Sequence, residues 1–193
     1  MSTEATMSGT RERLLETAAT LAYRNGVGVG VEALCRTAGV SKRSMYQLFA
    51  SKDELLAASL EERAALFASS MMPPPAADSA LTPRERILYV FERVEENAPS
   101  PEYQGCPYLA VQVELKDVDH PASRVAARIK RALQEFFRDE AARGGASDPE
   151  LLGRQLTLVF DGASARAGIR ADSLHGGLAT ATVATLLDAA GVH

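Results

Sequence analysis

Residues 42–47 contain five polar side chains that could bind nucleic acid. They are Lys42, Arg43, Ser44, Tyr46 and Gln47. Lysine and arginine neutralise phosphates, while guanidinium, hydroxyl and amide groups can form hydrogen bonds with base edges in a major groove. Apolar residues recur between and after them at spacings of three and four, which predicts a helix with one buried and one polar face. The same pattern would also fit a solvated helix face in any small helical domain.

The neighbouring residues predict a helix-turn-helix arrangement around this segment. Residues 31–38 are long enough for about two helical turns, and Gly39 can adopt the left-handed conformation that ends a helix. Ser41 can cap the next helix, so the order is helix, short glycine turn, helix. Further on, Ser51 can cap another helix, and Asp53 and Glu54 would place negative charge in its first turn, where the helix dipole favours it.

Charge is distributed unevenly along the chain. The formal net charge of −4 argues weakly against a nucleic-acid partner. Between residues 24 and 52, however, five basic residues stand against Glu32 alone, so this region has a net charge of +4. The five are Arg24, Arg36, Lys42, Arg43 and Lys52. A basic region on an otherwise acidic protein is typical of a nucleic-acid-binding surface.

The segment from Arg11 to Leu56 resembles the DNA-binding domain of the tetracycline-repressor (TetR) family. The resemblance rests on Ala38-Gly39-Val40-Ser41-Lys42, followed by Tyr46, Phe49, Ser51-Lys52 and Leu55. It implies an all-α fold of about nine helices. We expect a three-helix helix-turn-helix DNA-binding domain at residues 10–51 and a helical ligand-binding and dimerisation domain at residues 52–193. The polar, acidic residues 1–9 are expected to form a disordered tail.

Several residues are predicted to contact phosphates. Lys42 and Lys52 would do so through their charge, and the resemblance implies the same role for the hydroxyl of Tyr46. The backbone N–H groups of Gly30 and Val31 lie at a predicted helix start, where they could also bind a phosphate. Gly30 departs from the family pattern, because threonine or serine is common at this position.

Three other side chains are predicted to reach base edges. They are Arg43, Ser44 and Gln47. Arginine with guanine and glutamine with adenine are the pairs that the major groove favours.

The rest of the chain is predicted to be helical. A helix from Lys52 to about residue 71 should end before the three prolines at 73–75, and Thr82-Pro83 and Asp148-Pro149 are typical helix starts. The last two predicted helices, residues 151 to about 167 and 174 to about 190, are rich in alanine, glycine and leucine but poor in charge. Burial in a two-fold four-helix bundle with a second copy would explain this, and the resemblance likewise implies a homodimer.

The resemblance also indicates a candidate effector site, because six residues lie on segments that surround a cavity in relatives. They are Phe67, Met71, Phe91, Tyr103, Cys106 and Tyr108. An apolar site with few polar groups would suit a small aromatic or lipophilic effector, although each residue could equally belong to the core. Cys106 could instead be a redox-sensing thiol at a helix N-terminus.

Enzyme chemistry is not predicted. The chain has three histidines and none of the Gly-x-Ser-x-Gly, His-Glu-x-x-His or phosphate-loop motifs. Asp117, Asp119 and His120 are possible metal ligands, but their spacing matches no zinc or calcium loop, and a capped turn before a helix explains them better. The sequence therefore predicts no enzyme, no cofactor and no metal, and the alternative to DNA binding is a helical scaffold protein.

The expected location is the cytoplasm. No apolar run approaches the roughly 20 residues of a membrane span, and the only two cysteines, Cys35 and Cys106, are too far apart in sequence to suggest a disulfide framework. Together with the resemblance, these observations predict a DNA-binding transcriptional regulator. We expect a repressor that a small-molecule effector releases from a palindromic operator in double-stranded DNA.

Overall fold

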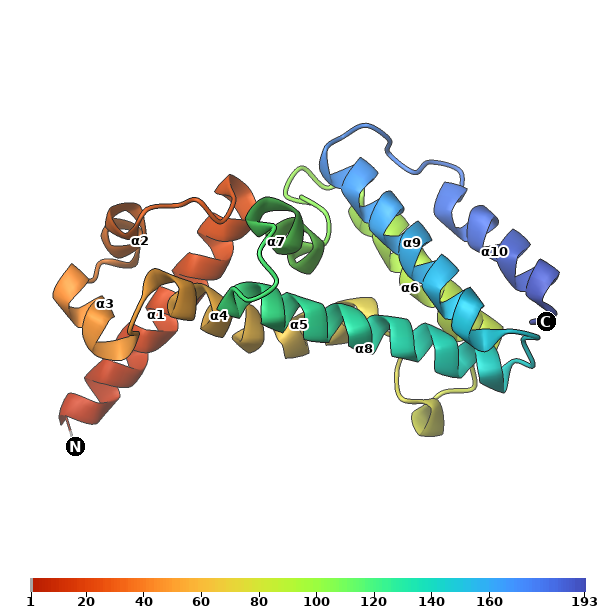
Figure 1. Cartoon of the computed structure of the whole chain (residues 1–193), viewed down its shortest axis with the longest axis horizontal. Helices are drawn as coiled ribbons and strands as arrows, with labels where there is room; N and C mark the ends of the chain where they lie inside the picture. The colour runs from red at the N-terminus through yellow and green to blue at the C-terminus, as the bar shows by residue number, and fades with distance from the viewer. Residues whose placement is uncertain (1) are drawn as a thin grey trace. The chain divides into compact units, whose positions relative to one another are not determined.

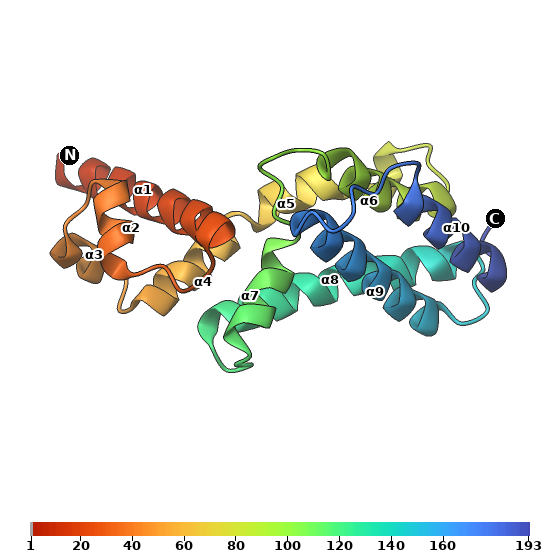
Figure 2. The same ribbon diagram turned by 90° about the horizontal axis from the view of Figure 1, so that it is seen from above.

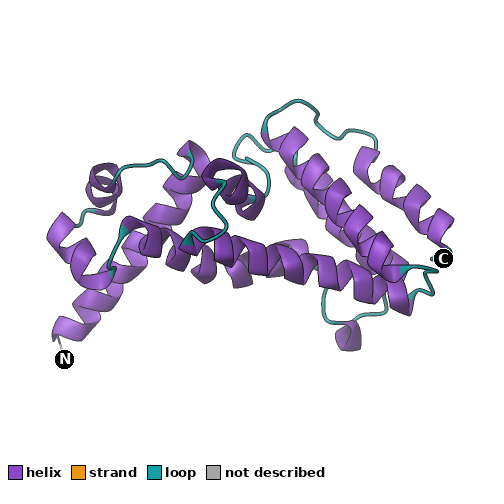
Figure 3. Ribbon diagram, in the orientation of Figure 1, coloured by secondary structure: helices purple, strands orange, loops and turns teal. Residues whose placement is uncertain are grey.

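A computed structural model of the chain describes residues 2–193, and the side chains of residues 7–193. The described residues form ten α-helices and one 3-10 helix and contain no strand, which confirms the predicted all-α class (Figures 1 and 3). The chain divides into two compact units. The first contains the residues up to Ala64 together with Pro107–Arg128, and the second contains Ala65–Cys106 and Ile129–His193.

The first unit is built around its N-terminal helix. α1 (Ser2–Asn25) packs against α2 (Val31–Ala38), α3 (Lys42–Leu48) and α4 (Lys52–Glu62), as Figure 2 shows. The unit also contains α7 (Pro107–Leu115) and the first residues of α8 (Pro121–Arg143). α4 ends at Glu62, and α5 (Ala64–Met71) follows after Arg63, so the single helix predicted for residues 52–71 is two helices.

Apolar residues from α1 to α4 form one core in this unit. Its buried members are Leu14, Leu15, Ala18, Leu34, Cys35, Ala38, Met45, Phe49 and Leu55. Met45 of α3 and Phe49, which directly follows this helix, are 0% and 4% exposed. Cys35 is 5% exposed in this core, and its burial raises the pKa of the thiol.

Residues 2–9 differ from the expected disordered tail, because they form the first part of α1. Met1 lies outside the described residues. The segment has no proline, and its Glu4, Ala5 and Met7 are residue types with high helix propensity. Extension of a helix that is already nucleated by packing costs little, so the helix continues past Thr10 toward the N-terminus.

The unit boundary differs from the one expected between residues 51 and 52. Residues 107–128 fall in the same compact unit as α1 to α4, and three polar contacts join them to α4. The Tyr108 hydroxyl donates to the Leu60 carbonyl at 3.2 Å, His120 Nε2 lies 3.3 Å from Asp53 Oδ1, and Arg128 pairs with Glu61. These contacts join residues more than 45 positions apart, which local sequence patterns cannot predict.

In the second unit, α6 is the central helix. The unit contains η1 (Ala76–Asp78), α6 (Pro83–Asn97), α9 (Pro149–Gly168) and α10 (Leu178–Ala190), together with most of α5 and the later part of α8. α6 packs against α9 and α10, and α9 packs against α10. Phe91 of α6 is fully buried; its ring stacks on Phe137 at 5.5 Å and meets the edge of Phe160 at 6.4 Å.

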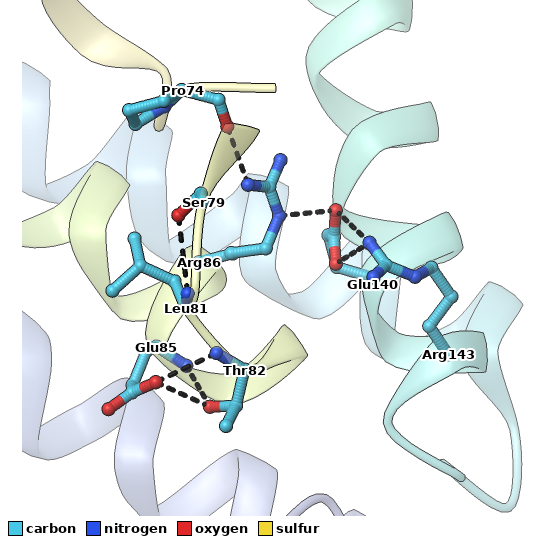
Figure 4. Close-up of polar contacts among 8 residues, drawn as sticks. All are labelled: Pro74, Ser79, Leu81, Thr82, Glu85, Arg86, Glu140 and Arg143. Carbon is cyan, nitrogen blue, oxygen red and sulfur yellow. Dashed lines mark hydrogen bonds and ion pairs between the residues drawn. The ribbon is translucent and has the colours of Figure 1, made fainter. Parts of the chain in front are cut away.

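A buried ion pair connects α6 and α8 within this unit. Arg86 Nε donates to Glu140 Oε1 at 2.8 Å, and both side chains are less than 8% exposed. A second nitrogen of the same guanidinium donates to the Pro74 carbonyl at 2.6 Å, and Arg143 adds two hydrogen bonds to Glu140 (Figure 4). Both buried charges therefore have partners, and removal of either one would leave the other uncompensated.

Side-chain caps define the helix starts in the second unit. Thr82 and Glu85 form a reciprocal capping box at α6, and the hydrogen bonds from Thr82 lower the pKa of Glu85. At α10 the cap comes from another helix: Glu95 of α6 accepts hydrogen bonds from the Ala179 and Thr180 amides. α10 therefore starts four residues later than predicted, after Gly177, which adopts a φ of +73°.

Among the described residues, no helix has the length and apolar character needed to span a membrane.

Candidate nucleic-acid interface

A glycine turn and a serine N-cap define the start of α3. Gly39 adopts the predicted left-handed conformation with φ 65°, and the Val40 amide closes the turn on the Cys35 carbonyl at 2.9 Å. Ser41 is in an extended conformation, and its Oγ accepts a hydrogen bond from the Ser44 amide at 3.0 Å. The predicted helix-turn-helix is therefore formed by the residues that indicated it in the sequence.

The polar face of α3 is largely exposed. Lys42, Arg43 and Gln47 are exposed, and Tyr46 is 53% exposed although it is a large aromatic residue. Ser44 is half-buried, and its hydroxyl lies 2.8 Å from that of Ser41, so it is shared with the helix cap. The structure thus brings five of the predicted contact residues together on one short helix.

Lys42 forms one weak ion pair. Its Nζ lies 3.7 Å from Glu32 Oε2, and both side chains are more than half exposed. Exposed pairs of this kind contribute about 0–1 kcal/mol and are screened by salt. A phosphate could therefore compete with Glu32 for this ammonium group.

Gly30 and Val31 lie at the start of α2, as predicted. Gly30 is the N-cap, with φ −74° and ψ 151°, and no side chain caps the helix. The first intrahelical hydrogen bond runs from Leu34 to the Gly30 carbonyl at 3.1 Å. The amides ahead of Leu34 in this turn have no intrahelical acceptor, which is the property that makes a helix start suitable for an anion.

Lys52 differs from the other predicted contacts because its ammonium group binds the protein itself. The side chain is half-buried, and Nζ donates to the Val27 carbonyl at 3.0 Å. An ammonium group has three donors, so this hydrogen bond leaves capacity for a phosphate. The contact also holds the linker between α1 and α2.

The six predicted effector-site residues fall in different units. Five of them belong to the second unit: Phe67, Met71, Phe91, Tyr103 and Cys106. Tyr108 belongs to the first unit and is 1% exposed. Met71, Phe91 and Cys106 are buried, and Phe67 and Tyr103 are half-buried.

The three possible metal ligands in residues 117–120 have structural partners. Asp117 Oδ1 accepts a hydrogen bond from the Asp119 amide at 2.9 Å, and His120 Nδ1 accepts one from the Ala122 amide at 3.1 Å. They form a turn and a helix cap, which is the explanation that the sequence favoured.

One contact of the interface could not be found from the sequence. Glu114 of α7 accepts a hydrogen bond from the Val27 amide at 2.8 Å, across 87 positions of the chain. Glu114 is exposed and is the one charged residue of α7, but no motif or spacing in this segment predicts its contact with Val27.

The helix-turn-helix, with a cationic and amide-bearing recognition helix packed on the core of α1 to α4, defines the protein class as a DNA-binding transcriptional regulator. The sequence profile of the bacterial regulatory proteins of the tetR family matches residues 14–59. This match covers α2, α3, the second half of α1 and most of α4.

Solved structures match over nearly the whole chain. A TetR-type transcriptional regulator of Streptomyces avermitilis is 70% identical, with a TM-score of 0.92 over 95% of this chain and 99% of that chain. SCO4454, a TetR-family transcriptional regulator of Streptomyces coelicolor, is 25% identical, with a TM-score of 0.81 over 95% of this chain and 97% of that chain. This chain belongs to the TetR family of transcriptional regulators, whose members bind DNA and form dimers.

A curated relative matches over a shorter region. The HTH-type transcriptional regulator YjdC of Escherichia coli is 25% identical over 89 residues, which cover 46% of this chain and 47% of YjdC. The aligned part thus spans about half the length of this relative.

Proposed function

We propose that the protein is a cytoplasmic, non-enzymatic repressor that binds a palindromic operator as a homodimer and is released by a small-molecule effector. The observation that carries the proposal is the exposed polar face of α3, with Tyr46 53% exposed beside exposed Lys42, Arg43 and Gln47. Tyr46 is a large aromatic residue, yet about half of its surface is exposed on the same helix as Lys42 and Arg43. Contact of its hydroxyl with a phosphate would explain its position.

A face of α9 supports the homodimer. Exposed residues recur on this helix at spacings of four and three, and they are apolar, small or uncharged: Leu151, Gln155, Leu158, Gly162, Ala165 and Ile169. Leu158 is 74% exposed and Ile169 is 76% exposed. Leu178 at the start of α10 is 47% exposed as well. An uncharged helix stripe of this length favours a second copy as its partner, because a two-fold axis would bury the same stripe on both chains.

Release of the operator would follow from a change in the separation of the two α3 helices. Half-sites in a duplex are read together only when the recognition helices are spaced by about one turn, or a multiple of it. An effector that binds more tightly to a dimer with another spacing lowers operator affinity. The factor is the ratio of the effector's affinities for the two forms of the dimer. The five candidate effector-site residues of the second unit are aromatic or apolar in character, which favours a small aromatic or lipophilic effector. They are Phe67, Met71, Phe91, Tyr103 and Cys106.

Selection of bound duplexes from a random library with the purified chain tests the function. We expect a palindrome with half-sites about one helical turn apart, or a multiple of it. If Lys42 and Lys52 of both protomers neutralise phosphates, the logarithm of affinity should fall with the logarithm of salt concentration with a slope of about −4. A helical scaffold protein would enrich no sequence, and its retention of DNA would not depend on the palindrome.

Substitution of Gln47 tests base reading within the selected operator. We expect Gln47→Ala to reduce discrimination at one base pair of each half-site by about 1–3 kcal/mol, because a bidentate contact with adenine would be lost. Binding to a set of single-base operator variants measures this change. Equal weakening on every sequence would contradict the assignment.

Tyr46→Phe provides the matched comparison on the same helix. Loss of the hydroxyl should weaken binding to all operator variants by a similar factor, since a phosphate contact contains no sequence information. The two substitutions should therefore differ in pattern, even if their effects on the best operator are of similar size.

A further inference from the structure

The backbone of Val27 is held from both sides by charged side chains. Lys52 Nζ of α4 donates to the Val27 carbonyl at 3.0 Å, and the Val27 amide donates to Glu114 Oε2 of α7 at 2.8 Å. Val27 lies in the short linker between α1 and α2, where regular secondary structure supplies no partner for these groups. Both hydrogen bonds involve a charged group, and such bonds are stronger than neutral ones.

Gly26 makes the approach of Glu114 possible. Its φ is +85°, a conformation that other residues rarely adopt. A Cβ at this position would lie 2.6 Å from Glu114 Oε2, closer than van der Waals contact allows. The turn at the end of α1 is therefore shaped so that a carboxylate from α7 can reach the next amide.

Val27 is three positions before Gly30, the N-cap of α2. Gly30 caps that helix, and its first amides are the predicted phosphate donors. A shift of the linker would move these amides relative to the phosphate, and a hydrogen bond weakens over a few tenths of an ångström. The position of Val27 therefore affects the distance between the first amides of α2 and the DNA phosphate.

α7 can act as a fixed support for this contact. Its first turn contains Tyr108, whose hydroxyl donates to the Leu60 carbonyl of α4 at 3.2 Å, and its last turn contains Glu114. Because α7 is attached to α4 near one end, the carboxylate at its other end is presented at a defined place. Within the first unit, α7 thus connects α4 to the α1–α2 linker.

We propose that Glu114 is a positioning residue for DNA binding, which fixes the α1–α2 linker through the Val27 amide and so sets the phosphate contact at the start of α2. The proposal rests on the proposed DNA-binding function. Glu114 itself need not touch DNA. Any displacement of α7 would be transmitted to α2 through this hydrogen bond.

The test compares Glu114→Ala, Glu114→Gln and the parent chain as full-length proteins. Amide hydrogen exchange of Val27, followed by NMR without DNA, should be faster in Glu114→Ala and near the parent rate in Glu114→Gln, whose amide oxygen can still accept the hydrogen bond. Unchanged Val27 exchange in Glu114→Ala would overturn the proposal. This measurement does not depend on operator binding, so it tests the linker contact even if the protein binds no DNA.

Operator binding gives the second measurement. We expect Glu114→Ala to bind about three- to tenfold more weakly, which is the effect of losing roughly one hydrogen bond. Phosphate-ethylation interference should lose signal only at the phosphate that the start of α2 contacts. Base preference should be unchanged. Glu114→Gln should restore most of the affinity. Parent-like affinity in Glu114→Ala, or an altered base preference, would contradict a positioning role.

Glu61→Ala is the matched control in the same unit. Glu61 is also an exposed glutamate that makes a long-range contact, its ion pair with Arg128, but it does not touch the α1–α2 linker. We expect it to leave Val27 exchange and the phosphate pattern as in the parent. Lys52→Ala is less informative, because Lys52 is itself a predicted phosphate contact. Absence of operator binding by the parent would refute the proposed function and would still leave the Val27 result interpretable.

Discussion

Arg86→Ala should lower the free energy of unfolding by about 3 kcal/mol, which is a large part of the stability of a typical domain. The substitution leaves the Glu140 carboxylate, whose side chain is 7% exposed, without its buried partner. It also removes the donor that satisfies the Pro74 carbonyl (Figure 4). We expect a value near the lower end of the range for broken buried ion pairs because Arg143 still pairs with Glu140. Urea denaturation at one fixed protein concentration measures the effect.

Two further variants separate charge burial from general disruption. Arg86→Met combined with Glu140→Leu removes both buried charges and should recover most of the lost stability, because apolar replacements of a buried ion pair are often neutral. Arg138→Ala breaks an exposed pair with Asp139 in the same unit and should cost less than about 1 kcal/mol. A loss in Arg86→Ala no larger than that in Arg138→Ala would show that the buried pair is not important for stability.

Leu158→Glu should convert the proposed dimer into a monomer and reduce operator affinity by about 10²–10⁴-fold. Leu158 is 74% exposed on the uncharged stripe of α9, so the substitution places two carboxylates at the proposed two-fold interface and leaves the interior of each protomer unchanged. A monomer reads one half-site and loses the effective concentration that dimerisation provides. Sedimentation velocity would measure the oligomeric state, and titration of the selected palindrome would measure the affinity.

Val118→Glu is the control for this experiment. Val118 is 84% exposed in the turn between α7 and α8, so the same change of an exposed apolar residue is made away from α9. It should leave both the dimer and operator affinity unchanged. Leu158→Glu should keep parent-like affinity for a single half-site and a parent-like helical circular dichroism spectrum. A dimeric Leu158→Glu protein would exclude α9 as the interface.

The DNA-binding helices could be predicted closely because their signals are local. Gly39 takes the left-handed conformation that the turn requires, and Ser41 and Ser51 accept hydrogen bonds from the amides three residues on. Each of these features depends on residues within one or two helical turns. Burial of Met45 and Phe49 followed equally from their spacing.

Predictions were less accurate where a helix end depends on distant residues. α10 starts at Leu178 rather than near residue 174, because Glu95, more than 80 positions earlier, caps its first amides. The helix predicted for residues 52–71 is two helices divided at Arg63; the Arg63 guanidinium donates to Thr20 of α1 at 3.1 Å, although this hydrogen bond does not itself explain the break. No property of either segment alone indicates these contacts.

The sequence was sufficient for the all-α class, for the helix-turn-helix and for the residue types on the exposed face of α3, since backbone propensity, capping and apolar spacing act over a few residues. Folding was needed to bring Glu114 to Val27, Lys52 to the same linker, and Arg86 to Glu140. Such contacts depend on where whole helices pack, and packing is the sum of many weak apolar interactions spread along the chain. For that reason the residues that would read DNA could be recognised in the sequence, whereas the residues that hold them in position became visible only in the folded chain.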